Sequence, residues 1–147
     1  MTRGMLAAAL YRLDGLPDVP SGGTHFSDLT SDKYYYNAVR WAQSQDIIKG
    51  ITPSYFGGEM DITREQAAVM LYRYAEAKGY DITGRSANIS TYTDYNETSD
   101  YAREALSWAN HNSIITGITP TRLAPKESAT RAQAAKMIHA FATAFVE

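Results

Sequence analysis

The chain has 147 residues, enough for one domain or for a small array of subunits that share a core. Hydrophobic residues make up 44% of it and charged residues 20%, which excludes a disordered tail, and no apolar run is long enough to cross a membrane. The net charge of −2 argues against a general nucleic-acid binder, and the absence of cysteine excludes disulfides and cysteine-ligated zinc.

The first predicted elements are a helix over residues 2–13 and a short helix over residues 32–45. In the short helix the apolar positions recur at i, i+3, i+4 and i+7, which places them on one face: Tyr35, Ala38, Val39 and Ala42. A loop rich in Gly, Pro and Thr follows over residues 50–62. Little of the chain is typical of strands beyond short pairings in such loops.

A longer helix is predicted to begin after Thr63. Thr63 and Gln66 have the spacing of a capping box, in which each side chain bonds the backbone N–H of the other residue. Gly79 is suited to ending this helix, and the polar segment 81–91 is expected to be a linker. The same order then returns as a short helix over 101–110, a loop over 117–129 and a helix after Thr130, with Gln133 completing its capping box.

Three sequence blocks repeat at one spacing, which predicts a repeat protein. TREQAA at 63–68, GITP at 50–53 and AVRWA at 38–42 return 67 residues later as TRAQAA, GITP and ALSWA. FSD at 26–28 returns as YTD at 92–94. The opening helix matches only the last part of this pattern, so we expect a first repeat that lacks its front half.

An arginine follows the helix cap in every copy, as Arg3, Arg64 and Arg131. A positive charge in the first helical turn opposes the helix dipole, so its recurrence needs a reason. The structural reason would be an ion pair with a nearby carboxylate such as Asp61 or Glu127. The functional reason would be an anion site, in which guanidinium and first-turn amides together hold a carboxylate.

Nothing in the sequence indicates catalysis or a resident cofactor. The histidines do not recur between repeats, no nucleophile or phosphate-binding motif is present, and no acid–base pair stands out among the carboxylates. We therefore predict no catalytic residue, no metal and no cofactor. Asp28 and Asp94 do recur, either as turn-forming residues or as part of a site, and the recurring Trp41 and Trp108 are expected at the core edge.

These repeated blocks closely resemble the S-layer homology module of bacterial, chiefly Gram-positive, envelope proteins. The resemblance rests on the FSD and YTD turns, the two short-helix blocks, the Gly-Ile pairs and the two Thr-Arg blocks, and it covers almost the whole chain. It implies an all-α fold of tandem helix-loop-helix repeats packed as a pseudo-threefold bundle. On this basis the expected parts are a truncated first repeat over 1–16, a second repeat over 25–80, a linker over 81–91 and a third repeat over 92–147.

The resemblance also implies a function, which is anchoring to secondary cell-wall polysaccharide through a pyruvyl carboxylate. Arginines at helix N-termini, in grooves between repeats, would hold the acid, and neighbouring residues would shape the sugar site. The expected polysaccharide-binding residues are Arg3, Arg64, Arg131, Asp28, Asp94, Tyr34, Tyr101, Gly50 and Gly117. The family often has Trp where this chain has Tyr34 and Tyr101, and a Tyr ring stacks with less area.

Location and partners follow from the same resemblance. We expect an extracellular module of the cell wall or S-layer that belongs to a larger protein whose signal peptide lies outside this chain, with no nucleic-acid or membrane partner. The opening helix has an apolar stripe whose partner in the first repeat is missing, so a homodimer through this segment is expected: Met5, Leu6, Ala9 and Leu10. The rival hypothesis is a protein–protein or self-assembly module that uses the same aromatic-rich grooves.

Overall fold

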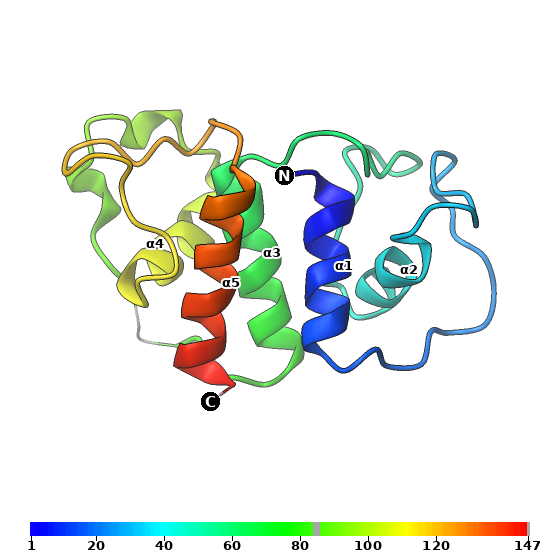
Figure 1. Cartoon of the computed structure of the whole chain (residues 1–147). Coiled ribbons are helices and arrows are strands. Elements are labelled where there is room, and N and C mark those ends of the chain that lie inside the picture. The colour runs from blue at the N-terminus through cyan, green and yellow to red at the C-terminus, as the bar shows by residue number, and fades with distance from the viewer. Residues whose placement is uncertain (84–85, 147) are drawn as a thin grey trace. The chain divides into compact units, whose positions relative to one another are not determined.

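A computed structural model describes residues 1–83 and 86–146 of the chain (Figure 1). These ranges contain five α-helices and three short 3-10 helices, in the order α1 (Arg3–Leu13), α2 (Tyr36–Ser44), α3 (Arg64–Ala77), η1 (Ile89–Thr91), η2 (Tyr95–Glu97), η3 (Asp100–Ala102), α4 (Arg103–His111) and α5 (Arg131–Phe145). Within the described ranges there is no strand, only isolated bridges such as the one between Thr63 and Ser128. The all-α prediction is confirmed.

The long helices begin where the sequence places them. The Thr63 hydroxyl accepts from the Gln66 N–H and the Gln66 side chain accepts from the Thr63 N–H, so the capping box of α3 is complete. Thr130 and Gln133 form the same box at α5. Gly79 lies just beyond the last turn of α3 with φ +71°, a backbone conformation that glycine adopts without strain.

The short helix α2 begins at Tyr36, four residues later than predicted. Successive i to i−3 turns precede it instead, with the Lys33 N–H donating to the Thr30 carbonyl and the Tyr36 N–H to the Lys33 carbonyl. No side chain caps α2, so the sequence holds no signal that would fix its first residue.

The predicted apolar stripes form the core. Their large members are almost fully buried, among them Tyr35, Leu71, Tyr74, Leu106 and Phe141. The two tryptophans are buried as well, with Trp41 3% and Trp108 1% exposed, so the prediction that they lie at the core edge is wrong. The Trp41 ring lies against Tyr11 of α1, and the Trp108 ring lies against Tyr72 of α3 and Phe145 of α5. These contacts come from other helices, which a helical-wheel argument does not include.

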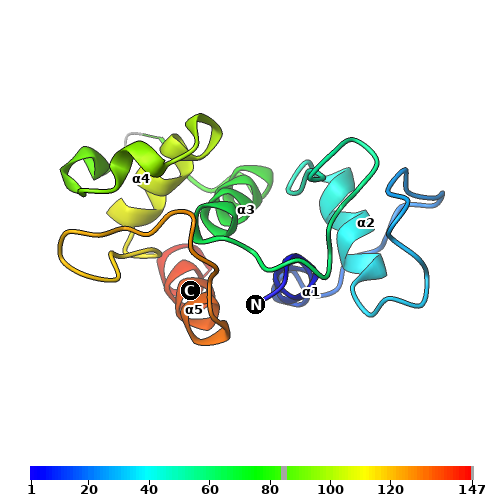
Figure 2. The same ribbon diagram turned by 90° about the horizontal axis from the view of Figure 1, so that it is seen from above.

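The chain divides into two compact units, Met1–Asp61 and Ile62–Glu147. In the first unit α1 packs on α2, and in the second α3 packs on α4 and α5, with α3 and α5 side by side in both views (Figures 1 and 2). Each unit therefore joins the long helix of one sequence repeat to the short helix of the next. The pseudo-threefold arrangement concerns how units combine and stays a prediction.

The opening helix has a partner within its own unit. Leu6 and Leu10 are 1% and 0% exposed, and α1 contacts α2. The argument for a homodimer, which rested on an apolar stripe without a partner, therefore loses its basis.

The two units fill one equivalent space in different ways. In the first, the Tyr35 ring fills it: a Cβ atom at Gly4 or at Gly58 would lie 2.5 Å from that ring. The Tyr35 hydroxyl donates to Glu59 at 2.8 Å.

In the second unit Ala102 takes the place of Tyr35 and Glu65 takes the place of Gly4. The Glu65 carboxylate is 2% exposed and accepts from the Ser99 N–H at 3.0 Å and from the Lys126 ammonium at 2.7 Å. A buried carboxylate with these partners thus replaces a buried ring, and each unit keeps a filled interior.

Replacing Gly58 by Ala tests how tightly the Tyr35 ring is seated. The added Cβ would overlap the ring, so we expect Gly58→Ala to lower the free energy of unfolding by about 1–3 kcal/mol. Gly23→Ala is the matched control, since nothing lies within 4 Å of its Cβ, and it should be neutral or stabilising by up to about 1 kcal/mol. Urea denaturation measures both, and equal effects would contradict the packing described.

Candidate functional site

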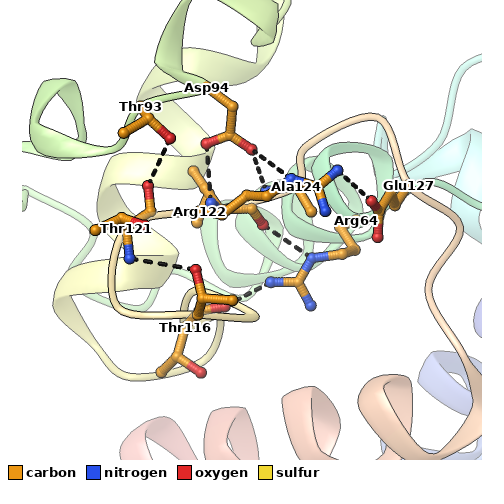
Figure 3. Close-up of polar contacts among 10 residues, drawn as sticks. Arg64, Thr93, Asp94, Thr116, Thr121, Arg122, Ala124 and Glu127 are labelled. Carbon is orange, nitrogen blue, oxygen red and sulfur yellow. Dashed lines mark hydrogen bonds and ion pairs between the residues drawn. The ribbon is translucent and has the colours of Figure 1, made fainter.

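The recurring arginine and the recurring aspartate hold the same loop residue in the second unit. Arg64 is 4% exposed, and its Nε donates to the Leu123 carbonyl at 3.1 Å while its Nη2 donates to the Thr116 carbonyl at 2.5 Å (Figure 3). Asp94 accepts from the N–H of that same Leu123 at 2.9 Å and from the Ala124 N–H at 2.7 Å. Leu123 is therefore held through its carbonyl by one repeat and through its N–H by the next.

The first unit repeats this arrangement. Arg3, 6% exposed, donates to the Phe56 carbonyl at 3.0 Å and to the Lys49 carbonyl at 2.8 Å. Asp28 accepts from the N–H groups of Phe56 and Gly57, both at 2.8 Å. We call this set of hydrogen bonds, from the arginine and the aspartate to the loop between them, the Arg–Asp clamp.

The clamp bears on the anion site that was expected at the N-terminus of α3. The Arg64 N–H donates to the Glu127 carbonyl at 2.9 Å and the Glu65 N–H to the Pro125 carbonyl at 3.0 Å, so loop carbonyls occupy the direction in which a free anion was expected. The expected structural alternative, an ion pair with a carboxylate, is not what satisfies Arg64 either. Burial lowers the pKa of Arg64, while the charges of Glu127 and Asp94 act to raise it, and a guanidinium remains charged throughout the accessible range.

One part of the Arg64 guanidinium remains available. Its Nη1 makes no hydrogen bond with any residue in the described ranges, and Arg64 lines a cavity of about 170 Å³. Gly117 lines the same cavity, together with Gln133 and Lys136 of α5. The structure thus brings two of the expected site residues together with a second cation. We call this space the Arg64–Lys136 cavity.

Gly117 and Gly50 are required by close backbone approach. A Cβ atom would lie 2.3 Å from the Thr119 carbonyl oxygen at Gly117, and 2.1 Å from the Thr52 carbonyl oxygen at Gly50. The glycines therefore fix the loop that the clamp holds. Gly50 also lines a cavity of about 510 Å³ in the first unit.

The remaining expected residues lie at the surface. Tyr34 and Tyr101 are 62% and 58% exposed, which leaves each ring accessible for stacking. Arg131 is exposed and makes no hydrogen bond or ion pair with the described part of the chain, unlike Arg3 and Arg64. The three arginines therefore occupy the same helical position but two different environments.

Lys136 is the residue that sequence reasoning missed. It lies one turn after Gln133 on α5, but the equivalent position of α3 is Val69, so the repeat pattern gives no signal for it. Lys136 could have been identified only from knowledge of which side chains of α5 lie beside the loop that follows α4.

The described ranges contain no group of three His, Asp or Glu side chains placed to hold a metal ion. None of the helices in those ranges has the length and apolar character that a membrane crossing requires.

Comparison with known proteins identifies the architecture. The model of the S-layer homology domain matches residues 25–68 and 91–135. The chain belongs to the S-layer homology domain family. Domains of this family are anchoring modules of cell-surface proteins and bind cell-wall polymers, which agrees with the resemblance drawn from the repeated blocks.

Relatives show the same modules within much longer proteins. The chain is 30% identical over 139 residues to an amylopullulanase of Thermoanaerobacterium thermosulfurigenes, and 27% identical over 139 residues to the exoglucanase XynX of Acetivibrio thermocellus. These matches cover 95% of this chain but 7% and 12% of the relatives. A surface-layer 125 kDa protein of Lysinibacillus sphaericus is 26% identical over 96 residues, 65% of this chain and 8% of that protein.

The clamp predicts that two arginines at equivalent positions differ in their contribution to stability. Arg64→Met should lower the free energy of unfolding by about 2–5 kcal/mol, because it leaves two loop carbonyls without donors. Arg131→Met, at an exposed position, should change it by no more than about 0.5 kcal/mol. If chemical denaturation gave similar losses for both variants, the clamp would not be a main determinant of stability.

Acid should weaken the clamp through Asp94. Burial acts to raise the pKa of Asp94, but the N–H groups of Leu123 and Ala124 and the charge of Arg122 outweigh it, so the pKa lies below its ordinary value of 3.8. A lowered folded-state pKa stabilises the protein above the ordinary value, and this stability is lost as the pH falls through the folded-state value. Thermal unfolding should therefore show an acid-dependent loss below about pH 4 that is smaller in Asp94→Asn. The same slope in both proteins would assign the effect to other carboxylates.

Proposed function

We propose that the chain anchors a larger surface protein to secondary cell-wall polysaccharide by binding a carboxylate of the polymer in the Arg64–Lys136 cavity. The observation that carries this proposal is the pairing of an unused guanidinium nitrogen with the Lys136 ammonium around one small cavity. Two cations at a partly enclosed site favour an anion, and charge-assisted hydrogen bonds to a carboxylate are the stronger kind.

Some residues around the cavity fix the loop, and others are available to contact the ligand. Arg64 uses Nε and Nη2 to fix the loop, so its remaining nitrogen is presented in a defined position rather than on a mobile side chain. Asp94 fixes the same loop from its other side and so acts as a positioning residue. Gly117 lets the ligand approach the backbone, and the exposed Tyr101 ring offers a face for stacking against a sugar.

The ligand that fits this chemistry is a pyruvyl ketal on a sugar unit, which places one carboxylate on an otherwise uncharged ring. The first unit offers the equivalent residues Arg3, Asp28, Tyr34 and Gly50, with Lys49 beside the glycine. The exposed Arg131 supplies a further guanidinium for the polymer. Several weak sites on one repeating polymer raise apparent affinity through effective concentration.

Removing the Lys136 charge tests the site without disturbing the clamp. Lys136→Gln should weaken binding to purified wall sacculi in co-sedimentation by about tenfold or more, the effect of one charge-assisted hydrogen bond. Arg12→Gln is the matched control, since it removes the same charge from an exposed residue of α1 that does not line the cavity. If the two variants lost affinity equally, binding would depend on net charge and not on this site.

The chemistry of the polymer supplies the second arm of that test. Mild acid removes pyruvyl ketals from the sacculi, and we expect it to abolish the difference between wild type and Lys136→Gln. Full wild-type binding to the treated sacculi would reject the carboxylate. The protein–protein alternative predicts instead that a carboxylated glycan does not compete with the bound partner.

A further inference from the structure

A second cavity in the second unit has none of the residues of the Arg64–Lys136 cavity. It measures about 660 Å³, which is within the range of small-molecule sites, and it lies between α3, α4 and the segment that leads into Tyr92. Tyr72, Tyr95 and Trp108 contribute aromatic rings to its wall. The function proposed above does not use this cavity.

The two units differ at several positions that line this cavity, and the largest change in side-chain size is at Arg40 and Ser107. In the first unit Arg40 reaches from α2 to the carbonyls of Pro20 and Gly22 and lies over the Tyr36 ring, with its guanidinium carbon 5.2 Å from the ring centroid. The cavity beside Arg40 measures about 200 Å³.

Ser107 stands where Arg40 would be expected in the second unit, 67 residues later. Its hydroxyl donates to the Ala87 carbonyl, and the Ala87 N–H donates back to the Ser107 carbonyl at 3.1 Å. The incoming segment is therefore held by a short side chain, and the cavity lies open beside it.

Two residues that line this cavity each have a buried donor without a partner in the described part of the chain. The Nε1 of Trp108 and the Nε of Arg103 make no hydrogen bond within the described ranges. Buried N–H groups in folded proteins are almost always paired, so each unpaired donor needs an explanation. Both residues line the same cavity, so a ligand with acceptor oxygens would satisfy these donors once their side chains turn toward it.

The charges on the wall indicate an uncharged ligand. Arg103 pairs with Asp100 at 2.8 Å and lies over the Tyr95 ring at 5.3 Å, while Glu104 accepts from the Tyr72 hydroxyl at 3.0 Å. One cation and one carboxylate leave the lining residues without net charge. Aromatic rings beside hydrogen-bonding groups of both kinds suit a sugar ring, which presents C–H groups and hydroxyls.

We propose that this cavity is a second saccharide site, which binds an uncharged sugar unit. It rests on the proposed function only in taking that sugar to be part of the same wall polymer. The two sites would then differ in chemistry: the Arg64–Lys136 cavity takes the carboxylate, and the cavity beside Trp108 takes a neutral ring.

The two tryptophans allow a direct test on the full chain by NMR. Trp108 lines the cavity, and Trp41 is its counterpart in the first unit, where Arg40 stands in place of Ser107. Titration with N-acetylmannosamine or glucose should give a saturable shift of the Trp108 indole N–H resonance and leave the Trp41 indole unchanged. Shifts of both indoles or of neither, or a shift of Trp108 with pyruvate and not with a neutral sugar, would overturn the proposal.

A substitution taken from the first unit provides the second arm. Ser107→Arg should fill the cavity and abolish the Trp108 response, whereas Ser107→Ala should keep it. If Ser107→Arg does not fold, the wild-type titration alone decides the matter. Wall binding that remains sensitive to Lys136→Gln without any Trp108 response would overturn this proposal alone, and a Trp108 response without wall binding would overturn the proposed function alone.

Discussion

A single backbone residue held from two sides organises each unit of this protein. The arginine at the first position of a long helix binds the carbonyl of Leu123 or Phe56, and the aspartate of the following repeat binds the N–H of the same residue. This Arg–Asp clamp joins three segments that are far apart in sequence. Burying a charged side chain costs free energy unless it gains hydrogen-bond partners, and the loop carbonyls are those partners. The same bonds offset the unfavourable interaction between the guanidinium and the helix dipole.

The clamp also explains why repeats and packing units differ. The second repeat contributes its short helix α2 to the first unit and its long helix α3 to the second, because the arginine and the aspartate that meet come from adjacent repeats. The clamp is the same in both units, but the residues that fill the interior differ between them. Tyr35 over two glycines in one unit corresponds to Glu65 with Lys126 in the other, and Arg40 corresponds to Ser107. The last of these differences lies beside the cavity of the second unit, where the clamp is intact.

Much of the fold could be predicted from the sequence because it depends on local signals. Capping boxes and apolar spacing identify α3 and α5 and the core face of α2, since these are properties of neighbouring residues. The buried state of Arg64 could not be predicted, because its partners are backbone carbonyls 52 and 59 residues away. Every residue has a backbone carbonyl, so the sequence does not mark which ones will accept. Lys136 was missed for the related reason that it occurs in one repeat only.

The coupling between Arg64 and Asp94 tests the clamp most directly. A double-mutant cycle of Arg64→Met and Asp94→Asn measures whether the two side chains, which do not bond each other, act through the loop they share. The account predicts a coupling free energy of about 1 kcal/mol or more, because loss of either side chain releases the loop and removes much of what the other contributes. Effects that add to within about 0.5 kcal/mol would contradict it, since the two residues would then stabilise the protein independently.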